Sequence, residues 1–305
     1  MPPRLIINAD DFGLTPGVNR AIEELHRAKV LTSATLMATG PAFEDAVAVV
    51  HANPTLGVGC HILLTDGAPV SPPEIIPTLL GPDGKTFRPS LIDFLQALLR
   101  GKINEQEIER EALAQIQKLR HAGINITHLD THKHTHLFPP VCRALLKTAE
   151  QNSIPAIRQP FEQPWSLALG HGKRVRRLQV KLLGSLKTKF EQQPQIRNKS
   201  ILSTDGTIGI SATGNLYGET LREILQAMPA EGTFELVCHP GYNDSDLDRI
   251  TTRLRAHREI ERNALLTEVP AITLHPNAPQ LINYGELGTH ETGQFTSHTQ
   301  ADRVL

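Results

Sequence analysis

The stretch 127–136 holds the densest group of chemically active side chains in this chain of 305 residues. It reads Thr-His-Leu-Asp-Thr-His-Lys-His-Thr-His and contains four of the 14 histidines. Because strand side chains alternate between two faces, a strand here would place five ionisable residues on one face. These residues are His128, Asp130, His132, His134 and His136. Such a face can bind a metal ion or transfer protons, and we favour this interpretation over surface histidines on a loop.

An acidic pair, Asp10 and Asp11, follows an apolar stretch at residues 4–9. An aspartate in this place often caps the helix that follows a strand, and that interpretation stays open. Adjacent residues point in different directions, so one carboxylate can bind a metal ion while the other remains free as a base. A cation also relieves the repulsion between neighbouring carboxylates. The pair is therefore a candidate for both metal binding and general base catalysis.

His61 ends another apolar stretch, Gly-Val-Gly-Cys-His at 57–61, whose glycines allow a close approach of the backbone. A single histidine of this kind is usually part of the core. Together with Asp11 and His132, however, it completes a set of two histidines and one carboxylate from three strands. Such a set leaves coordination positions for water and substrate, so it can activate water and polarise a carbonyl group.

Two further polar residues end predicted strands. His239 lies in Cys-His-Pro-Gly-Tyr at 238–242, which is either a plain turn or part of the same rim. Arg158 ends Ala-Ile-Arg at 156–158 and either pairs with the free aspartate, Asp10, or faces solvent or a phosphate group. We treat both as candidate catalytic residues.

The elements that must position these residues alternate between short apolar stretches and segments of helical period, which is typical of βα units in a parallel sheet. Predicted strands span residues 4–9, 31–37, 56–64, 124–132, 155–158, 234–239 and 271–275. Predicted helices span residues 18–28, 43–50, 91–99, 105–121, 140–151, 219–228 and 251–266. Polar clusters at strand ends are typical of α/β barrels, whose active sites lie there. We therefore predict a single α/β barrel domain at 1–288, with insertions at 65–103 and 161–215, and a polar tail at 289–305.

The composition, with 39% apolar and 21% charged residues, is that of a soluble globular protein and excludes disorder, coiled coil and collagen. The 31 Lys and Arg against 32 Asp and Glu leave a net charge of -1, so no overall field attracts nucleic acid. The three cysteines form no paired framework, which fits a reducing compartment. We find neither a charged leader before a long apolar stretch nor a bilayer-spanning stretch, and we expect a cytoplasmic protein.

Residues 171–199, the basic segment, contain nine Lys or Arg and one acid, Glu191. Its apolar residues recur at helical spacing, which predicts a basic amphipathic helix. They are Val175, Leu178, Leu182, Leu186 and Phe190. The helix either packs this stripe on the barrel or lies on the anionic inner face of a membrane. Nucleic acid is the least favoured partner, because no aromatic residues are interleaved with the charge.

Five motifs together resemble the YdjC-like carbohydrate deacetylases, over almost the whole chain up to about residue 285. They are Asn-Ala-Asp-Asp-Phe-Gly at 8–13, Leu-Thr-Ser-Ala-Thr at 31–35, Gly-x-Gly-x-His at 57–61, the stretch 127–136 and Cys-His-Pro-Gly at 238–241. Within this family, Lys133-His134 and residues 154–158 look most like the hopanoid-biosynthesis-associated branch, the HpnK type, rather than the chitooligosaccharide branch.

The resemblance implies a (β/α) barrel of the deacetylase type, distorted or incomplete, and one divalent metal ion held by Asp11, His61 and His132. It also implies removal of the acetyl group from an N-acetylated amino sugar. For the hopanoid branch the implied substrate is an N-acetylglucosaminyl hopanoid lipid. Imidazole ligands favour Zn as the metal, with Mg, Co, Ni, Mn and Fe as alternatives.

The residues by themselves support the same chemistry. Asp10 accepts a proton from an attacking water whose pKa a metal ion lowers, and Arg158 orients Asp10. His239 protonates the leaving amine, with His134 or His136 as an alternative donor. A secondary or substrate-binding role falls to the remaining polar residues of the stretch: His128, Asp130, His134 and His136.

Other functions stay open beside this one. A chitooligosaccharide deacetylase would use the same site. A metal-dependent phosphoesterase usually needs two metal ions and more carboxylate ligands than this sequence offers. A catalytically silent binder of sugar lipids would be expected to lack Asp10 or a ligand, and none is missing. We expect no nucleic-acid partner, and a homodimer remains an alternative to a monomer.

Overall fold

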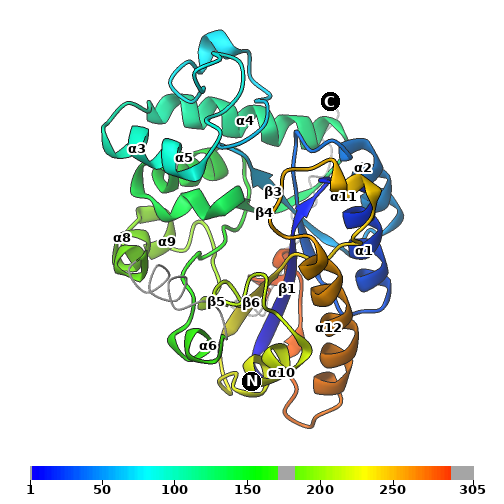
Figure 1. The fold of residues 1–305 in the computed structure, drawn as a ribbon. Helices are drawn as coiled ribbons and strands as arrows, with labels where there is room; N and C mark the ends of the chain where they lie inside the picture. The colour runs from blue at the N-terminus through cyan, green and yellow to red at the C-terminus, as the bar shows by residue number, and fades with distance from the viewer. Residues whose placement is uncertain (1, 171–182, 290–305) are drawn as a thin grey trace, which may run out of the picture.

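A curved parallel sheet forms the centre of the computed structural model, which describes residues 2–170 and 183–289 (Figure 1). Six strands run in the order β4-β3-β2-β1-β6-β5, and a seventh, β7, pairs with the first two residues of β1. The strands are β1 Arg4–Phe12, β2 Ser33–Leu36, β3 Gly57–Ile62, β4 Ile126–Thr131, β5 Gly206–Ile208, β6 Thr233–Cys238 and β7 Gln280–Leu281. The predicted α/β class and the distorted barrel are confirmed.

The edge strands β4 and β5 are connected only by isolated bridges through residues 155–163. Parallel bridges join Ile157 to Leu129 of β4 and Glu162 to Thr207 of β5. The predicted strand at 155–158 is thus present as single bridges rather than as a regular strand. The backbone N–H of Arg158 donates to the Leu129 carbonyl at 2.9 Å, which holds Arg158 beside the end of β4.

Helices lie around the sheet (Figure 1), and their buried apolar residues form one core with those of the strands. They are α1 Pro16–Arg27, α2 Phe43–Ala52, α3 Leu91–Leu99, α4 Glu105–His121, α5 Pro139–Gln151, α6 Pro164–Leu169, α8 Lys187–Glu191, α9 Pro194–Arg197, α10 Gly218–Gln226, α11 Ser245–Asp248 and α12 Ala256–Thr273. Short 3-10 segments are η1 Pro73–Ile75, η2 His132–Leu137, which is kinked, η3 Gly184–Leu186 and η4 Tyr284–Glu286. Helix α4 packs on α5, and α12 packs on both α1 and α10.

Strand β1 is the axis of the fold, because it pairs with β2, β6 and β7. Its residues from Leu5 to Phe12 are all buried. A strand covered on both faces gains apolar burial along its whole length, which explains the continuous apolar stretch at its start. The polar residues Asn8, Asp10 and Asp11 are therefore buried exceptions that need partners.

One predicted strand is wrong, and one observed strand was not predicted. Residues 271–275 were expected to form a strand, but they continue helix α12 and its C-terminal end, and the last strand is β7. A short apolar stretch fits either a strand or a buried helix, so its periodicity could not decide. Strand β5 lies inside the region 161–215 that the sequence predicted to be an insertion. With only three residues, it is too short to show a periodic pattern.

The basic segment is described only in part, since residues 171–182 lie outside the described residues. From 184 to 191 the 3-10 turn η3 continues directly into α8, and a separate short helix, α9, follows at 194–197. Phe190 is 3% exposed and packs edge-on against Phe161 with ring centroids 5.8 Å apart. At this position the apolar stripe packs on the core of the protein.

Among the described residues, no helix is both long and apolar enough to cross a membrane. The three cysteines, Cys60, Cys142 and Cys238, are buried and free, as expected for small core residues.

Candidate active site

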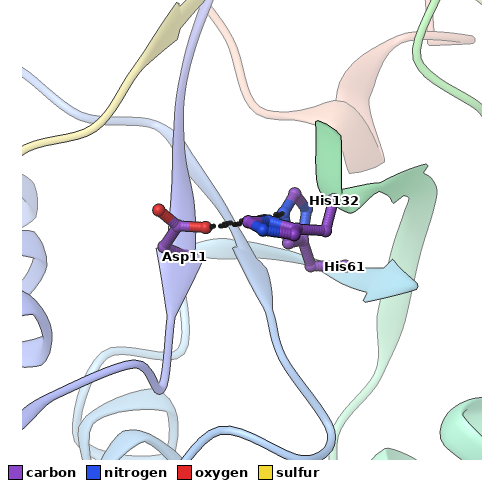
Figure 2. A group of neighbouring side chains, drawn as sticks. All are labelled: Asp11, His61 and His132. Atoms are coloured by element: carbon purple, nitrogen blue, oxygen red, sulfur yellow. Dashed lines mark hydrogen bonds and ion pairs between the residues drawn. The ribbon is translucent and has the colours of Figure 1, made fainter. Parts of the chain in front are cut away.

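Three side chains from different strands meet at the carboxyl ends of β1, β3 and β4 (Figure 2). Asp11 lies near the end of β1, His61 in β3, and His132 directly after β4. Asp11 Oδ1 lies 3.3 Å from His132 Nδ1 and 3.7 Å from His61 Nε2, and the two imidazole nitrogens are 3.3 Å apart. Carboxylate and imidazole donors that converge in this way fit a divalent metal ion such as Zn²⁺.

The backbone turns Asp11 towards the two histidines. Asp11 has φ 63°, a left-handed conformation that aspartate tolerates better than most residues. The register between β1 and β2 shifts between Ala9 and Phe12, which is the signature of a bulge. Bulges commonly redirect a side chain next to an active site. The irregularity therefore lets Asp10 and Asp11 serve different neighbours.

His61 is oriented by Asp130 of β4. Its Nδ1 donates to Asp130 Oδ1 at 2.7 Å, and its Nε2 faces Asp11 and His132, where a bound metal ion would replace the second proton. This carboxylate–imidazole pairing is typical of metal-binding histidines. Burial alone would lower the pKa of His61, but the charge of Asp130 and its hydrogen bond raise it to about 9. The site therefore favours a cation beside these carboxylates.

Asp10, the other half of the acidic pair, is held by Arg158. The guanidinium donates from Nη2 to Asp10 Oδ1 at 2.7 Å and from Nη1 to Oδ2 at 3.0 Å. Asn8 and Thr35 donate to the same carboxylate. Burial raises the pKa of Asp10, but the charge and hydrogen bonds of Arg158, together with the charges of His61 and His239, hold this pKa well below its ordinary value. The predicted pairing of Arg158 with Asp10 is present.

Arg158 is fully buried and surrounded by three carboxylates. Besides Asp10, its Nη1 lies 2.5 Å from Asp130, and its Nε and Nη2 lie 2.8 and 2.7 Å from Glu235. Tyr284 donates its hydroxyl to the other oxygen of Glu235 at 2.5 Å. All the donor directions of the guanidinium are thus used, which is how a buried charge becomes tolerable.

His239, at the end of β6, faces Asp10 from the other side. Its Nε2 lies 3.8 Å from Asp10 Oδ2. Its backbone N–H donates to Glu261 of α12 at 2.6 Å, which fixes where the residue leaves the strand. The side chain is 11% exposed, so the imidazole is close to solvent while its partners are buried. The predicted position of His239 at the barrel rim agrees with the structure.

A family model described as YdjC-like protein matches residues 4–273, almost the whole described chain. The chain belongs to the YdjC-like family. A curated relative from Brevibacillus brevis, named carbohydrate deacetylase, is 34% identical over 93% of this chain and 100% of its own. A second with the same name, from Thermoanaerobacter pseudethanolicus, is 31% identical over 93% of this chain and 98% of its own.

A solved structure supports the same family fold. It is described as a candidate cellobiose-phosphate cleavage protein from Enterococcus faecalis, and its sequence is 26% identical to this one. The two structures superpose with a TM-score of 0.70 over 94% of this chain and 99% of the other. The barrel described above is therefore shared by two proteins of different sequence.

The histidine-rich stretch of this YdjC-like protein does not form one strand face, which corrects the sequence analysis. Strand β4 ends at Thr131, and Lys133 and His134 adopt left-handed backbone angles within η2. Alternation therefore holds only up to His132. The chain turns back so that His136 is buried, with Nδ1 2.6 Å from the hydroxyl of Thr131. Burial lowers the pKa of His136 to about 4.

His128 also lies away from the three converging ligand atoms. It is fully buried and stacks on Tyr284 with ring centroids 3.7 Å apart. A Cβ at Gly59 would come within 2.5 Å of its ring, so the glycine predicted to allow a close approach does so here. Burial lowers the pKa of His128 to about 3, which keeps the ring neutral. The structure thus places His128 in the barrel interior, while His134 stays near the rim with its ring 6.5 Å from that of His136.

Sequence reasoning missed four residues that contact the site: Glu235, Arg258, Glu261 and Tyr284. Glu235 carried a readable signal, because an acid in the middle of the apolar strand β6 must have a buried partner. Arg258, Glu261 and Tyr284 carried no such signal in the sequence. They lie on α12 or after β7, and only tertiary packing brings these segments to the site.

Proposed function

We propose that this YdjC-like protein is a metal-dependent deacetylase that removes the acetyl group from an N-acetylated amino sugar. The observation that carries the proposal is the convergence of Asp11, His61 and His132, with the separate carboxylate of Asp10 beside them. The names of the curated relatives support the same activity.

The two aspartates have different roles in the proposed reaction. A divalent metal ion held by Asp11, His61 and His132 would lower the pKa of water and polarise the acetamide carbonyl. Asp10 accepts the proton of the attacking water, and Arg158 keeps this carboxylate ionised and in one orientation. His239, 3.8 Å from Asp10, donates the proton that the leaving amine needs. Proton acceptor and proton donor thus lie on neighbouring strands.

A phosphoesterase with two metal ions is less favoured. The described residues contain one more group with suitable donor atoms, formed by Asp10, His61 and Asp130. Both of its carboxylates already bind Arg158, at 2.7 Å and 2.5 Å. A second divalent ion would lie against this guanidinium and be repelled by it. The geometry therefore supports a single metal site, which fits hydrolysis of an amide.

For the substrate, we propose an N-acetylglucosaminyl hopanoid lipid and membership of the hopanoid-associated branch. Lys133-His134 and residues 154–158 support this assignment by their resemblance to that branch. A lipid-linked substrate would be reached most easily from the inner face of the membrane. Peripheral contact through the basic segment, 171–199, is the corresponding proposal.

The activity is tested by measuring acetate release from an N-acetylglucosaminyl lipid and from diacetylchitobiose, after metal removal and after Zn²⁺ add-back. Asp10→Asn and His132→Ala are compared with wild type, and His121→Ala, an exposed histidine of α4, serves as control. We expect acetate release that depends on metal and is lost in the first two variants only. Activity without metal, or undiminished activity in both variants, would refute the mechanism.

The substrate and membrane proposals have their own outcomes. A preference for diacetylchitobiose over the lipid would exclude the hopanoid assignment while leaving the deacetylase intact. Vesicles of phosphatidylglycerol should retain the protein at low salt and release it at high salt. Failure to co-sediment at low salt would remove the membrane contact.

A further inference from the structure

Helix α12 turns a charged face towards the candidate active site. Arg258 and Glu261 stand three residues apart, so they share one side of the helix, and each is 1% exposed. Glu261 accepts hydrogen bonds from the backbone N–H groups of His239 at 2.6 Å and Gly214 at 3.3 Å. Charged residues this deeply buried are retained only with partners. The start of α12 is thus built into the site rather than merely packed behind the sheet.

Arg258 contacts a proposed metal ligand directly. Its Nη2 donates to Asp11 Oδ2 at 2.6 Å, and its Nε donates to the Leu254 carbonyl at 3.0 Å, which fixes the guanidinium. The other carboxylate oxygen, Oδ1, faces His132 at 3.3 Å and His61 at 3.7 Å. The ion pair therefore divides the carboxylate into one oxygen held by the protein and one directed at the histidines.

A second arginine on the same helix provides a comparison. Arg262, one turn further, pairs with Glu24 of α1 through Nε at 2.5 Å and Nη2 at 2.6 Å. This ion pair ties α12 to α1 without touching Asp11, His61 or His132. Arg262 thus binds α12 to α1, whereas Arg258 contacts the proposed metal ligand Asp11.

We propose that Arg258 is a positioning residue for the metal ligand Asp11. This inference rests on the proposed metal site. Two physical effects oppose each other: the positive charge of Arg258 repels a divalent ion, whereas its hydrogen bond holds Oδ1 in the coordinating direction. We infer that orientation outweighs repulsion, because the aspartate is buried, has a left-handed backbone and has its second oxygen anchored at 2.6 Å.

The test is calorimetric titration of the metal-free protein with Zn²⁺, which needs no substrate. Arg258→Gln removes the charge and the hydrogen bond from Nη2 to Asp11, and we expect the Zn²⁺ affinity to fall about 10- to 100-fold, as for other partners of metal ligands. Arg258→Lys keeps the positive charge but lacks the planar guanidinium. The Zn²⁺ affinity of this variant should lie between those of Arg258→Gln and wild type. Arg262→Gln is the matched control and should stay within about twofold of wild type.

The outcomes separate this inference from the proposed function. Tighter Zn²⁺ binding by Arg258→Gln would mean that charge repulsion dominates, and it would overturn the positioning role. An equal loss in Arg258→Gln and Arg262→Gln would also overturn it, because docking of α12 would then be the cause. If wild type itself binds no divalent ion, the proposed metal site fails first. Far-UV circular dichroism of each variant confirms that the titrated protein is folded.

Discussion

Two neighbouring groups of acids and imidazoles show how one set of residue types serves two purposes. The rim group consists of Asp11, His61 and His132, and the interior group of Asp10, His61 and Asp130. In each group one donor atom from every residue lies within 4.8 Å of the others. The difference is the placement of arginine. Arg158 binds both interior carboxylates, whereas at the rim one oxygen of Asp11 remains directed at the histidines.

The rim group is also more exposed to solvent than the interior group. The side chain of His132 is 24% exposed, whereas those of Asp130 and Arg158 are fully buried. A buried guanidinium compensates the charge of the carboxylates around it, so these carboxylates need no metal ion. Donor geometry alone therefore does not define a metal site. The interior group is an ion-pair network that supports the rim group through the shared residue His61.

The largest effect should come from removing a rim ligand. His132→Ala deletes one of the three converging donors and leaves the interior network unchanged, so Zn²⁺ binding and acetate release should both be lost while the protein stays folded. Calorimetry, acetate release and thermal unfolding measure the three quantities. Retained Zn²⁺ binding in this variant would show that the metal lies elsewhere, and His121→Ala controls for the loss of a histidine.

Breaking the interior group should affect stability instead. Arg158→Met leaves Asp10, Asp130 and Glu235 buried without their cation, and we expect a loss of about 3–5 kcal/mol in the free energy of unfolding. Urea denaturation measures it. Arg143→Met is the control, because this arginine and its partner Glu105 are both largely exposed, and its loss should cost far less. Equal costs for the two variants would contradict a special role of the network.

Removal of a single hydroxyl group at the edge of the Arg158 network should also lower stability without changing Zn²⁺ binding, but by less. Tyr284→Phe removes the hydroxyl that donates to Glu235 at 2.5 Å but keeps the ring that stacks on His128. The unsatisfied carboxylate oxygen should lower the free energy of unfolding by about 1–3 kcal/mol. Zn²⁺ affinity should not change, since the rim ligands keep their partners. Tyr217→Phe, at an exposed tyrosine, is the matched control.

The smallest effect is a pH dependence. His128 is buried with its pKa lowered from 6.5 to about 3, so between these values the unfolded chain binds a proton that the folded protein does not. Unfolding therefore takes up this proton, and stability falls as the pH drops below 6.5. One proton corresponds to about 1.4 kcal/mol for each pH unit.

His128→Asn should remove this contribution. The slope of the free energy of unfolding between pH 6 and pH 5 should decrease by about one proton relative to wild type. His136, whose pKa is about 4, remains in the variant and keeps its own share of the slope. An unchanged slope in His128→Asn would show that this histidine is protonated in the folded state. His121→Asn, at an exposed position, should leave the slope as it is.

The sequence predicted the fold class and the positions of the candidate residues at strand ends. Asp10, Asp11, His61, His132, Arg158 and His239 all lie at predicted strand ends and all reach one region of the barrel. This worked because parallel strands bring their carboxyl ends to one edge, whatever connects them. The prediction failed at His134 and His136, where two residues with left-handed backbone angles end the alternation. A local turn of this kind leaves no periodic signal.

What the sequence by itself determined was the set of residue types at strand ends, because apolar stretches locate strands and polar residues after them must lie at the rim. Only the tertiary structure decided that arginine binds both oxygens of Asp10 but only one oxygen of Asp11. Arg158 and Arg258 are separated by 148 and 247 residues from the aspartates they bind. Packing of the whole chain brings together electrostatic partners that are so far apart in sequence. The different arginine contacts that result distinguish the proposed metal ligand Asp11 from the proposed base Asp10.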